Sequence, residues 1–147
     1  MAIEMLPEHG YVLAVYVASM FVHNAYMPIQ VGQARKKFGV KYPAMYATEA
    51  ETKDEKARNT FNCVQRAHQN CLENLPTFLS LLGAAGIKYP VVAASAGAVY
   101  LLGKVLYFRG YSTGEPSKRM QGWPAYFGLL TLAGCTGTLA YSLIMGK

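Results

Sequence analysis

The sequence predicts an all-α integral membrane protein, built as a bundle of four transmembrane helices. Of its 147 residues, 52% are hydrophobic and only 15% are charged, whereas about 25% is usual in soluble domains. The apolar residues form blocks, and the charges lie between the blocks. Each block approaches the roughly 20 residues that an α-helix needs to cross a bilayer. The length fits one domain, and we expect residues 1–147 to form it.

Each predicted helix corresponds to one of these blocks. The first contains Pro28 near its end, and the second begins amphipathic near Thr60 before it becomes fully apolar. The third follows the second after a turn of about three residues around Tyr89, and the fourth begins near Trp123. The predicted ranges are about 10–31, 60–87, 90–111 and 123–145.

The distribution of basic residues predicts the orientation in the membrane. The first and third connections lie on one side, and they hold most of the lysines and arginines. The positive-inside rule places this side in the cytosol, so that both termini face the other side. We attribute the net charge of +6 to this asymmetry and expect no nucleic-acid partner.

Polar residues recur inside two of the predicted helices, where they are costly and usually functional. In each set the spacing of three or four residues puts every member on one helical face. Two such faces on neighbouring helices predict a polar cleft that opens toward the cytosolic side. The second helix carries Asn62, Arg66, Asn70 and Glu73, and the third carries Tyr100, Lys104, Tyr107 and Tyr111.

This cleft suits a small zwitterionic ligand. Arginine pairs with carboxylates in bidentate geometry, glutamate can receive an ammonium group, and asparagine and tyrosine offer neutral hydrogen bonds. The alternative is that Arg66 and Glu73 neutralise each other while Lys104 extends toward the interface. That alternative leaves the aligned asparagines and tyrosines without an explanation.

Other residues carry weaker signals. His68 lies beside the polar face and is either a catalytic base or, as we prefer, a hydrogen-bonded part of its wall. The cysteines have no metal-ligand spacing, and we expect no metal site. Small residues around Gly134 in the fourth helix allow close helix approach, and they fit internal packing and a subunit interface equally well.

Several sequence strings resemble the microsomal glutathione transferase branch of the membrane-associated proteins in eicosanoid and glutathione metabolism. The resemblance extends from about Glu8 to Leu143. It implies a left-handed four-helix bundle that forms a homotrimer, with glutathione as co-substrate bound between adjacent subunits. The strings that carry it are residues 33–38, 41–46, 61–70 with Leu72 and Glu73, and 110–119.

The resemblance also implies residue roles. Arg119 stabilises the glutathione thiolate, and the glutathione molecule is held by Arg35, Arg66, Asn70, Glu73, Tyr107 and Tyr111. Because the loop at Gly114 is one residue longer than in the leukotriene-forming branch, Lys118 is the alternative to Arg119. Further candidates are His68, Lys36, Tyr100 and Lys104; Lys36 stands where that branch has an arginine proposed to act on the lipid epoxide.

These roles lead to two hypotheses about function. In the first, a glutathione thiolate attacks a hydrophobic electrophile or lipid hydroperoxide that enters from the membrane. The protein is then a glutathione transferase and glutathione-dependent peroxidase. Leukotriene-forming activity belongs to the same class. In the second, the chain is a non-catalytic scaffold or an accessory subunit of a larger membrane complex. The complete set of polar residues favours the enzyme. We expect it in the endoplasmic reticulum or the mitochondrial outer membrane.

Overall fold

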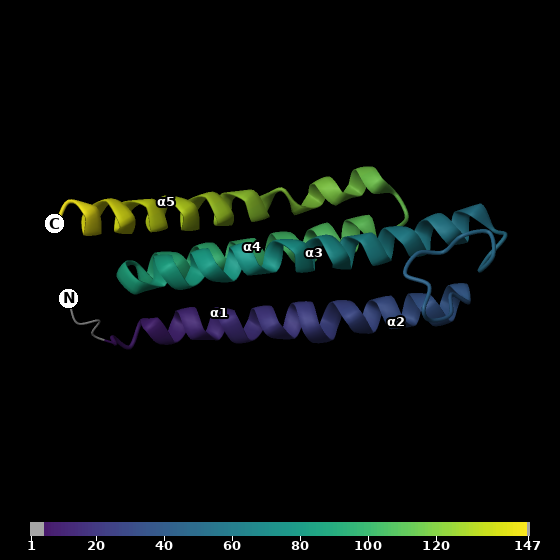
Figure 1. Ribbon diagram of the computed structural model, residues 1–147, viewed down its shortest axis with the longest axis horizontal. Coiled ribbons are helices and arrows are strands. Elements are labelled where there is room, and N and C mark those ends of the chain that lie inside the picture. Colours follow the sequence, from purple (N-terminus) through teal and green to yellow (C-terminus); the bar gives the residue numbers. More distant parts are fainter. Residues whose placement is uncertain (1–4, 147) are drawn as a thin grey trace.

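The computed structural model describes residues 5–146, which form helices joined by turns and loops. α1, η1 and α2 follow one another without a break, so the chain makes four long helical rods (Figure 1). The elements in order are α1 (His9–Phe21), η1 (Val22–Tyr26), α2 (Met27–Phe38), α3 (Glu55–Lys88), α4 (Pro90–Tyr111), η2 (Pro116–Gly122) and α5 (Pro124–Ile144).

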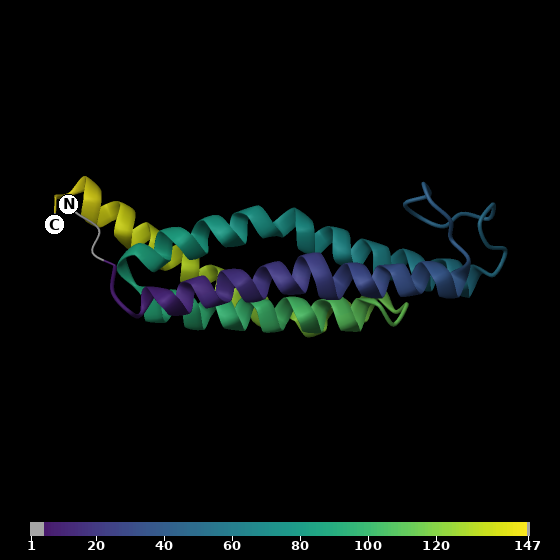
Figure 2. The ribbon, with the colours of Figure 1, turned by 90° about the horizontal axis from the view of Figure 1, so that it is seen from below.

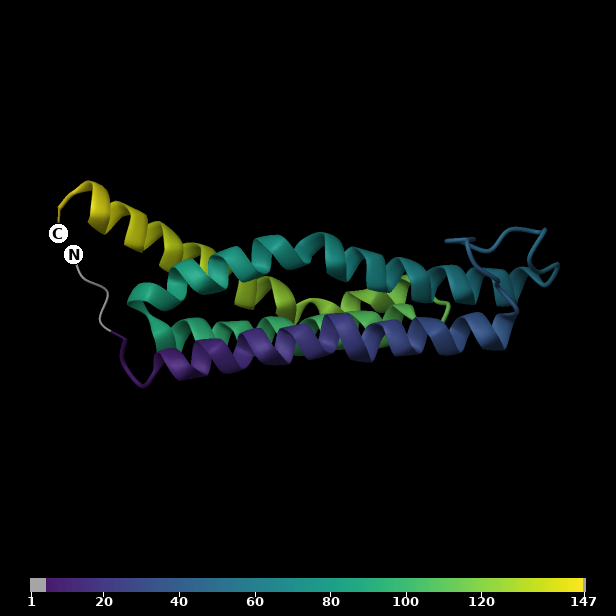
Figure 3. The same ribbon diagram turned by 60° about the horizontal axis from the view of Figure 1, so that its bottom comes forward.

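Helix α4 is at the centre of the arrangement and packs against α1, α3, η2 and α5. The first rod and α5 lie on opposite sides of it (Figure 1). The loops after α2 and α4 lie toward one end of the molecule, which we call the loop end, and α1 begins and α5 ends at the other. Toward its C-terminal end α5 diverges from the other helices (Figure 3).

Three of the rods are long and apolar enough to cross a membrane, and they span His9–Phe38, Pro90–Tyr111 and Pro124–Ile144. They support an integral membrane protein. Helix α3 does not meet this criterion among the described residues, because its first half carries the polar face. Its crossing of the membrane, and with it the four-span bundle, remains a prediction.

The helices extend further toward the loop end than the apolar blocks do. The first rod was expected to end near residue 31, but it continues to Phe38 and ends where Gly39 adopts a φ of 70°, a conformation that glycine tolerates. Helix α3 was expected from about residue 60, but it begins at Glu55, because the Asp54 carboxylate accepts hydrogen bonds from the backbone N–H groups of Lys56 and Ala57. Hydropathy marks the membrane-spanning part, whereas caps determine where a helix ends.

The first rod contains one wide π-helical turn, η1, directly before Pro28. In this turn the N–H of Met27 donates to the carbonyl of Val22, five residues earlier. The carbonyl of His23 then has no donor in its own helix, because proline at position 28 lacks an N–H. His68 Nε2 lies 3.1 Å from this oxygen and donates to it, so the ring of His68 joins α3 to the first rod.

Helix α3 has 34 residues with Pro76 inside it. Proline cannot donate to the carbonyl four residues earlier, and its ring pushes the preceding turn aside. Accordingly, α3 follows a bowed path along the molecule (Figure 2). The curve separates its polar first half from its apolar second half.

Side chains of the adjacent helices hold the long loop between α2 and α3. Arg35 is only 8% exposed, and its Nη1 donates to the carbonyl of Ala44 at 2.7 Å. The Asn62 amide accepts from the N–H of Ala47 at 2.7 Å and donates to its carbonyl at 3.0 Å. Hydrogen bonds from the hydroxyl and then the N–H of Thr48 hold the pKa of the Glu51 carboxyl below its ordinary value. Arg35 and Asn62 therefore fix the loop to α2 and α3 through hydrogen bonds.

Buried residues form two apolar clusters along the molecule. One surrounds Phe78, Leu82 and Tyr100, and the other surrounds Phe61 and Phe108. Tyr100 and Phe108 are both on α4, and Lys104 lies midway between them. The centre of α4 is thus a polar level between two apolar layers.

Glycines bring η2 and the start of α5 close to α4. A Cβ atom at Gly103 would collide with the backbone of Ala125, and one at Gly110 would collide with the carbonyl of Lys118. In contrast, a Cβ at Gly134 or Gly137 on α5 would meet nothing within 4 Å. Gly134 and Gly137 therefore do not serve packing within the chain.

Candidate functional site

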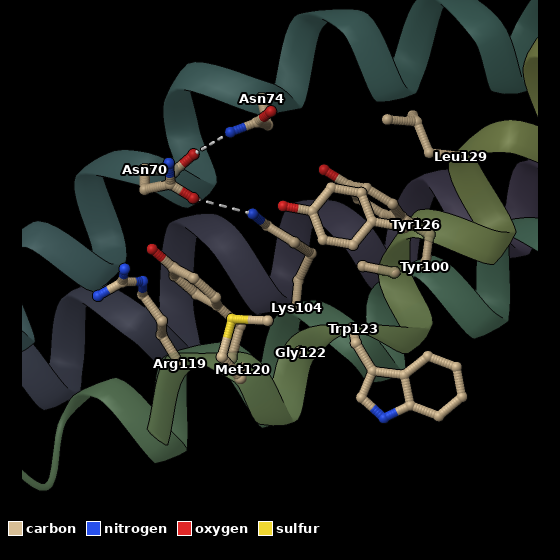
Figure 4. Close-up of a pocket in the computed structure, with 12 residues that line it drawn as sticks. Asn70, Asn74, Tyr100, Lys104, Arg119, Met120, Gly122, Trp123, Tyr126 and Leu129 are labelled. Carbon is tan, nitrogen blue, oxygen red and sulfur yellow. Dashed lines mark hydrogen bonds between the residues drawn. The ribbon is translucent and has the colours of Figure 1, made fainter. Parts of the chain in front are cut away.

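A pocket of about 300 Å³ lies at the polar level of α4 (Figure 4). Helix α3 forms one wall and α4 another, while η2 and the first turns of α5 complete it. The close approach at Gly103 positions this last wall. The lining residues are Asn70, Asn74, Tyr100, Lys104, Tyr107, Arg119, Met120, Gly122, Trp123, Ala125, Tyr126 and Leu129.

Lys104 is the buried cation of the pocket, with 7% of its surface exposed. Its ammonium group donates to Asn70 Oδ1 at 3.2 Å (Figure 4). The same group lies 4.8 Å from the centre of the Tyr107 ring. Asn74 donates in turn to the backbone carbonyl of Asn70 at 2.8 Å. Among residues 5–146, no carboxylate lies within 4.0 Å of Lys104. A charge in such surroundings is expensive unless an anion compensates it, so the pocket is suited to an anionic ligand.

Arg119 lines the pocket from η2, and its side chain is exposed. Its Nη1 donates to the carbonyl of Pro116 at 3.0 Å, and its guanidinium carbon lies 5.9 Å from the centre of the Tyr111 ring. Lys118 is not on the lining; its ammonium pairs with Glu115 at 2.9 Å. Of the two basic residues that the sequence left open, Arg119 is thus the one at the pocket.

The tyrosines of α4 lie on the side of the helix that faces the pocket. Tyr100 and Tyr107 line the pocket, and Tyr107 and Tyr111 meet edge to face with ring centres 5.7 Å apart. The Tyr100 ring stacks on Phe78 at 4.0 Å, and its hydroxyl is buried without a hydrogen-bond partner among the described residues. A buried hydroxyl without a partner is a group that a bound molecule can satisfy.

Arg66 and Glu73 lie outside this pocket. They pair with each other at 2.8 Å on α3, and their side chains are 42% and 46% exposed. The sequence correctly placed them on one helical face. The structure gives them the mutual neutralisation that was the alternative interpretation, and a ligand would have to compete with that ion pair.

The remaining predicted residues lie elsewhere. Arg35 supports the loop and, together with Lys36, lines a separate shallow groove. His68 bonds to the first rod, and Asn62 bonds to the loop, so neither faces the pocket. Asn70, Tyr100, Lys104, Tyr107 and Arg119 are the members of the predicted set that the chain brings together.

The wall that α5 contributes to the pocket was not predicted from the sequence. Trp123, Tyr126 and Leu129 give the pocket an aromatic and apolar side opposite the polar one. The spacing of three residues was visible in the sequence, but in an apolar helix it is indistinguishable from a surface that faces lipid. Among the described residues, no group of three or more histidine, cysteine, aspartate or glutamate side chains is arranged to hold a metal ion.

These features define a polytopic α-helical membrane protein with a pocket that is cationic on one side and apolar on the other. Residues 13–141 match the model of the MAPEG family. The chain therefore belongs to the MAPEG family, the membrane-associated proteins in eicosanoid and glutathione metabolism.

Individual relatives agree with this assignment. Human microsomal glutathione S-transferase 2 is 37% identical over 117 residues, which cover 79% of this chain and 72% of the relative. The bovine protein of the same name is 34% identical over 120 residues, covering 79% and 75%. Bovine leukotriene C4 synthase is 36% identical over 90 residues, covering 60% and 53%.

Proposed function

We propose that the chain is a membrane-bound glutathione transferase that also acts as a glutathione-dependent peroxidase on hydrophobic substrates. The pocket carries this proposal, because Lys104 and Arg119 offer positive charge on one side while Trp123 and Leu129 offer an apolar surface on the other. A water-soluble anionic thiol and a membrane-soluble electrophile can meet only where both surfaces share one cavity. The relatives named as glutathione transferases and leukotriene C4 synthase point to the same thiol.

The chemistry begins with the thiol of glutathione. A thiol with a pKa near 8.5 is only about 3% ionised at pH 7. A cation held about 4 Å from the sulfur, where water is scarce, lowers that pKa by roughly two units, and about three quarters of the thiol is then thiolate. We assign this role to Arg119, because it lines the pocket and cannot lose its proton. Asn70 and Tyr107 orient the peptide.

The thiolate has two routes from this point. With an electrophilic carbon, sulfur forms the S–C bond and a leaving group departs with the electron pair. With an epoxide, one C–O bond breaks instead, and the oxygen stays on the neighbouring carbon and takes a proton. With a lipid hydroperoxide, sulfur attacks the terminal oxygen and the O–O bond breaks. The lipid leaves as an alcohol after protonation, and the glutathione sulfenic acid reacts with a second glutathione to give the disulfide and water.

The assembly is part of the proposal. Helix α3 is joined to α4 through Tyr89 alone. If α4 crosses the membrane, α3 crosses it in the opposite direction, which gives four spans. We place the basic loops in the cytosol and the protein in the endoplasmic reticulum or the mitochondrial outer membrane. A homotrimer accounts for Arg35, Arg66 and Glu73, which lie away from the pocket of their own chain and would complete the site between subunits. Within the family, the sequence strings favour microsomal glutathione transferase type 3.

Glutathione consumption by the purified protein in detergent tests the proposal. We expect turnover with both a chlorodinitrobenzene and a fatty-acid hydroperoxide, strongly reduced in Asn70→Ala. Asn24→Ala is the matched control, because Asn24 is exposed on the first rod. Within residues 5–146, its side chain bonds to the sulfur of Met20 alone. If the folded protein binds glutathione but consumes none with either substrate, the chain is a scaffold or an accessory subunit of a larger complex.

A further inference from the structure

A second cavity lies toward the loop end, on another side of α4 from the pocket. It occupies about 460 Å³, within the range of small-molecule sites. Its walls are the end of the first rod, the first turns of α3 and the end of α4. It forms because α1 packs against α4 whereas α2 packs mainly against α3, so the first rod and α4 separate toward this end. We call it the interfacial groove.

The inner end of the interfacial groove is aromatic. The rings of Tyr26 and Phe108 meet edge to face there, with centres 5.9 Å apart. Lys37 follows Tyr26 by 11 residues, which corresponds to about 16 Å along a helix. The groove thus runs from an apolar level within the span toward the basic loop end.

The charge of the groove has one sign. Lys37 and Arg109 both line it and are both exposed. The three ion pairs found among residues 5–146 all lie elsewhere, so neither side chain has a carboxylate within 4.0 Å in that part of the chain. Among the residues that the structure describes, no acidic one contributes to the lining. Two unmatched cations on one groove favour an anionic occupant.

Neutral polar groups add a second, independent signal. Gln33 and Thr113 line the groove beside the cations. Ser112 lines it as well, and its hydroxyl oxygen is buried without a hydrogen-bond partner among the described residues. A buried hydroxyl normally has a partner, and a ligand with several oxygen acceptors would provide one.

We propose that the interfacial groove binds the headgroup of an anionic glycerophospholipid, with its glycerol end against Tyr26 and Phe108. A groove that is basic at the level of the headgroups and aromatic further inside matches the polarity of such a lipid. Basic pockets between membrane helices at this depth recognise anionic headgroups. The site contains none of the residues assigned to catalysis, and it does not depend on the glutathione reaction.

The test compares the intact protein with Lys37→Gln/Arg109→Gln, using Lys53→Gln/Lys56→Gln as the control. The control removes the same charge from the same end of the molecule, at exposed residues outside the groove. Native mass spectrometry and thermal unfolding are measured in detergent with added phosphatidylserine, phosphatidylcholine or inorganic phosphate. We expect phosphatidylserine to be retained and to raise the unfolding temperature of the intact protein and of the control. Its binding to the groove variant should be about 30-fold weaker.

Each of the following results would overturn the proposal. Equal stabilisation by inorganic phosphate would mean a site for free anions, and equal loss in the control would mean a diffuse surface charge. A change in the oligomeric state of the groove variant, measured by light scattering, would mean that the groove is a contact between subunits. If the groove variant does not fold, the single variants Lys37→Gln and Arg109→Gln are measured, and undiminished phosphatidylserine binding in both would contradict the site.

Discussion

Replacing Arg119 with alanine should remove most of the glutathione thiolate while changing glutathione binding little. A unit charge 4 Å from the sulfur contributes about 1 kcal/mol in water and about 4 kcal/mol at an effective dielectric constant of 20. Because Arg119 is exposed at the rim of the pocket, we take an intermediate value of about 2.7 kcal/mol, or two units in the thiol pKa. The thiolate fraction at pH 7 then falls about 25-fold.

The assay is the ultraviolet absorbance of the thiolate in the enzyme–glutathione complex, recorded across pH together with turnover. In Arg119→Ala the band should be weak at neutral pH and return as the pH rises through 8.5. Turnover should fall less than the thiolate fraction, because the more basic thiolate that remains is the better nucleophile.

Lys118→Ala is the paired control, since Lys118 is bound to Glu115 and lies off the lining. It should leave the thiolate band unchanged. If Lys118→Ala removes the band and Arg119→Ala does not, the assignment is displaced by one residue. If neither variant affects the band, the thiolate mechanism at this loop is refuted.

Three further predictions concern other parts of the molecule. Lys104→Met removes a buried charge without an acidic partner, so we expect an equal or higher unfolding temperature and at least tenfold weaker glutathione binding by calorimetry; a lower unfolding temperature with unchanged binding would make Lys104 a structural residue. Arg66→Ala should weaken glutathione binding by about 2–5 kcal/mol if Arg66 holds a carboxylate, and a folded variant of normal affinity would remove it from the site. Cysteines introduced at Thr52 and Ser117 should both react with an impermeant reagent in sealed microsomes, and labelling of one alone would contradict the proposed topology.

The polar level at the centre of α4 was predicted from the three- and four-residue spacing of polar side chains in the sequence. Asn70 and Lys104 were assigned to facing stripes on neighbouring helices, and they are hydrogen-bonded to each other. The prediction from spacing was possible because a charged residue within an apolar membrane helix almost always faces the interior of the bundle or a cavity. The position of Arg119 relative to Lys118 required coordinates, because a 3₁₀ turn such as η2 changes the direction of a side chain by about 120° per residue.

Roles that depend on one particular backbone atom could not be predicted. Arg35 bonds to the carbonyl of Ala44, and Asn62 bonds to Ala47, although both side chains have the chemistry of a ligand site. His68 was expected to be either a base or a hydrogen-bonded wall residue, and it donates to a carbonyl that became available only because η1 is a π turn. Residue type and spacing do not reveal which backbone oxygen lacks a donor.

The π turn at Val22–Tyr26 also limits how this protein can change. Such a turn holds one residue more than the same length of α-helix, and one residue corresponds to about 100° of rotation around the helix axis. α1 packs mainly against α4, whereas α2 packs mainly against α3. Deleting a single residue from this segment would restore a regular helix and rotate Arg35 away from the loop. We expect length changes here to be far less tolerated than in the loop of residues 48–54, even though no residue of the turn lines the pocket at Lys104.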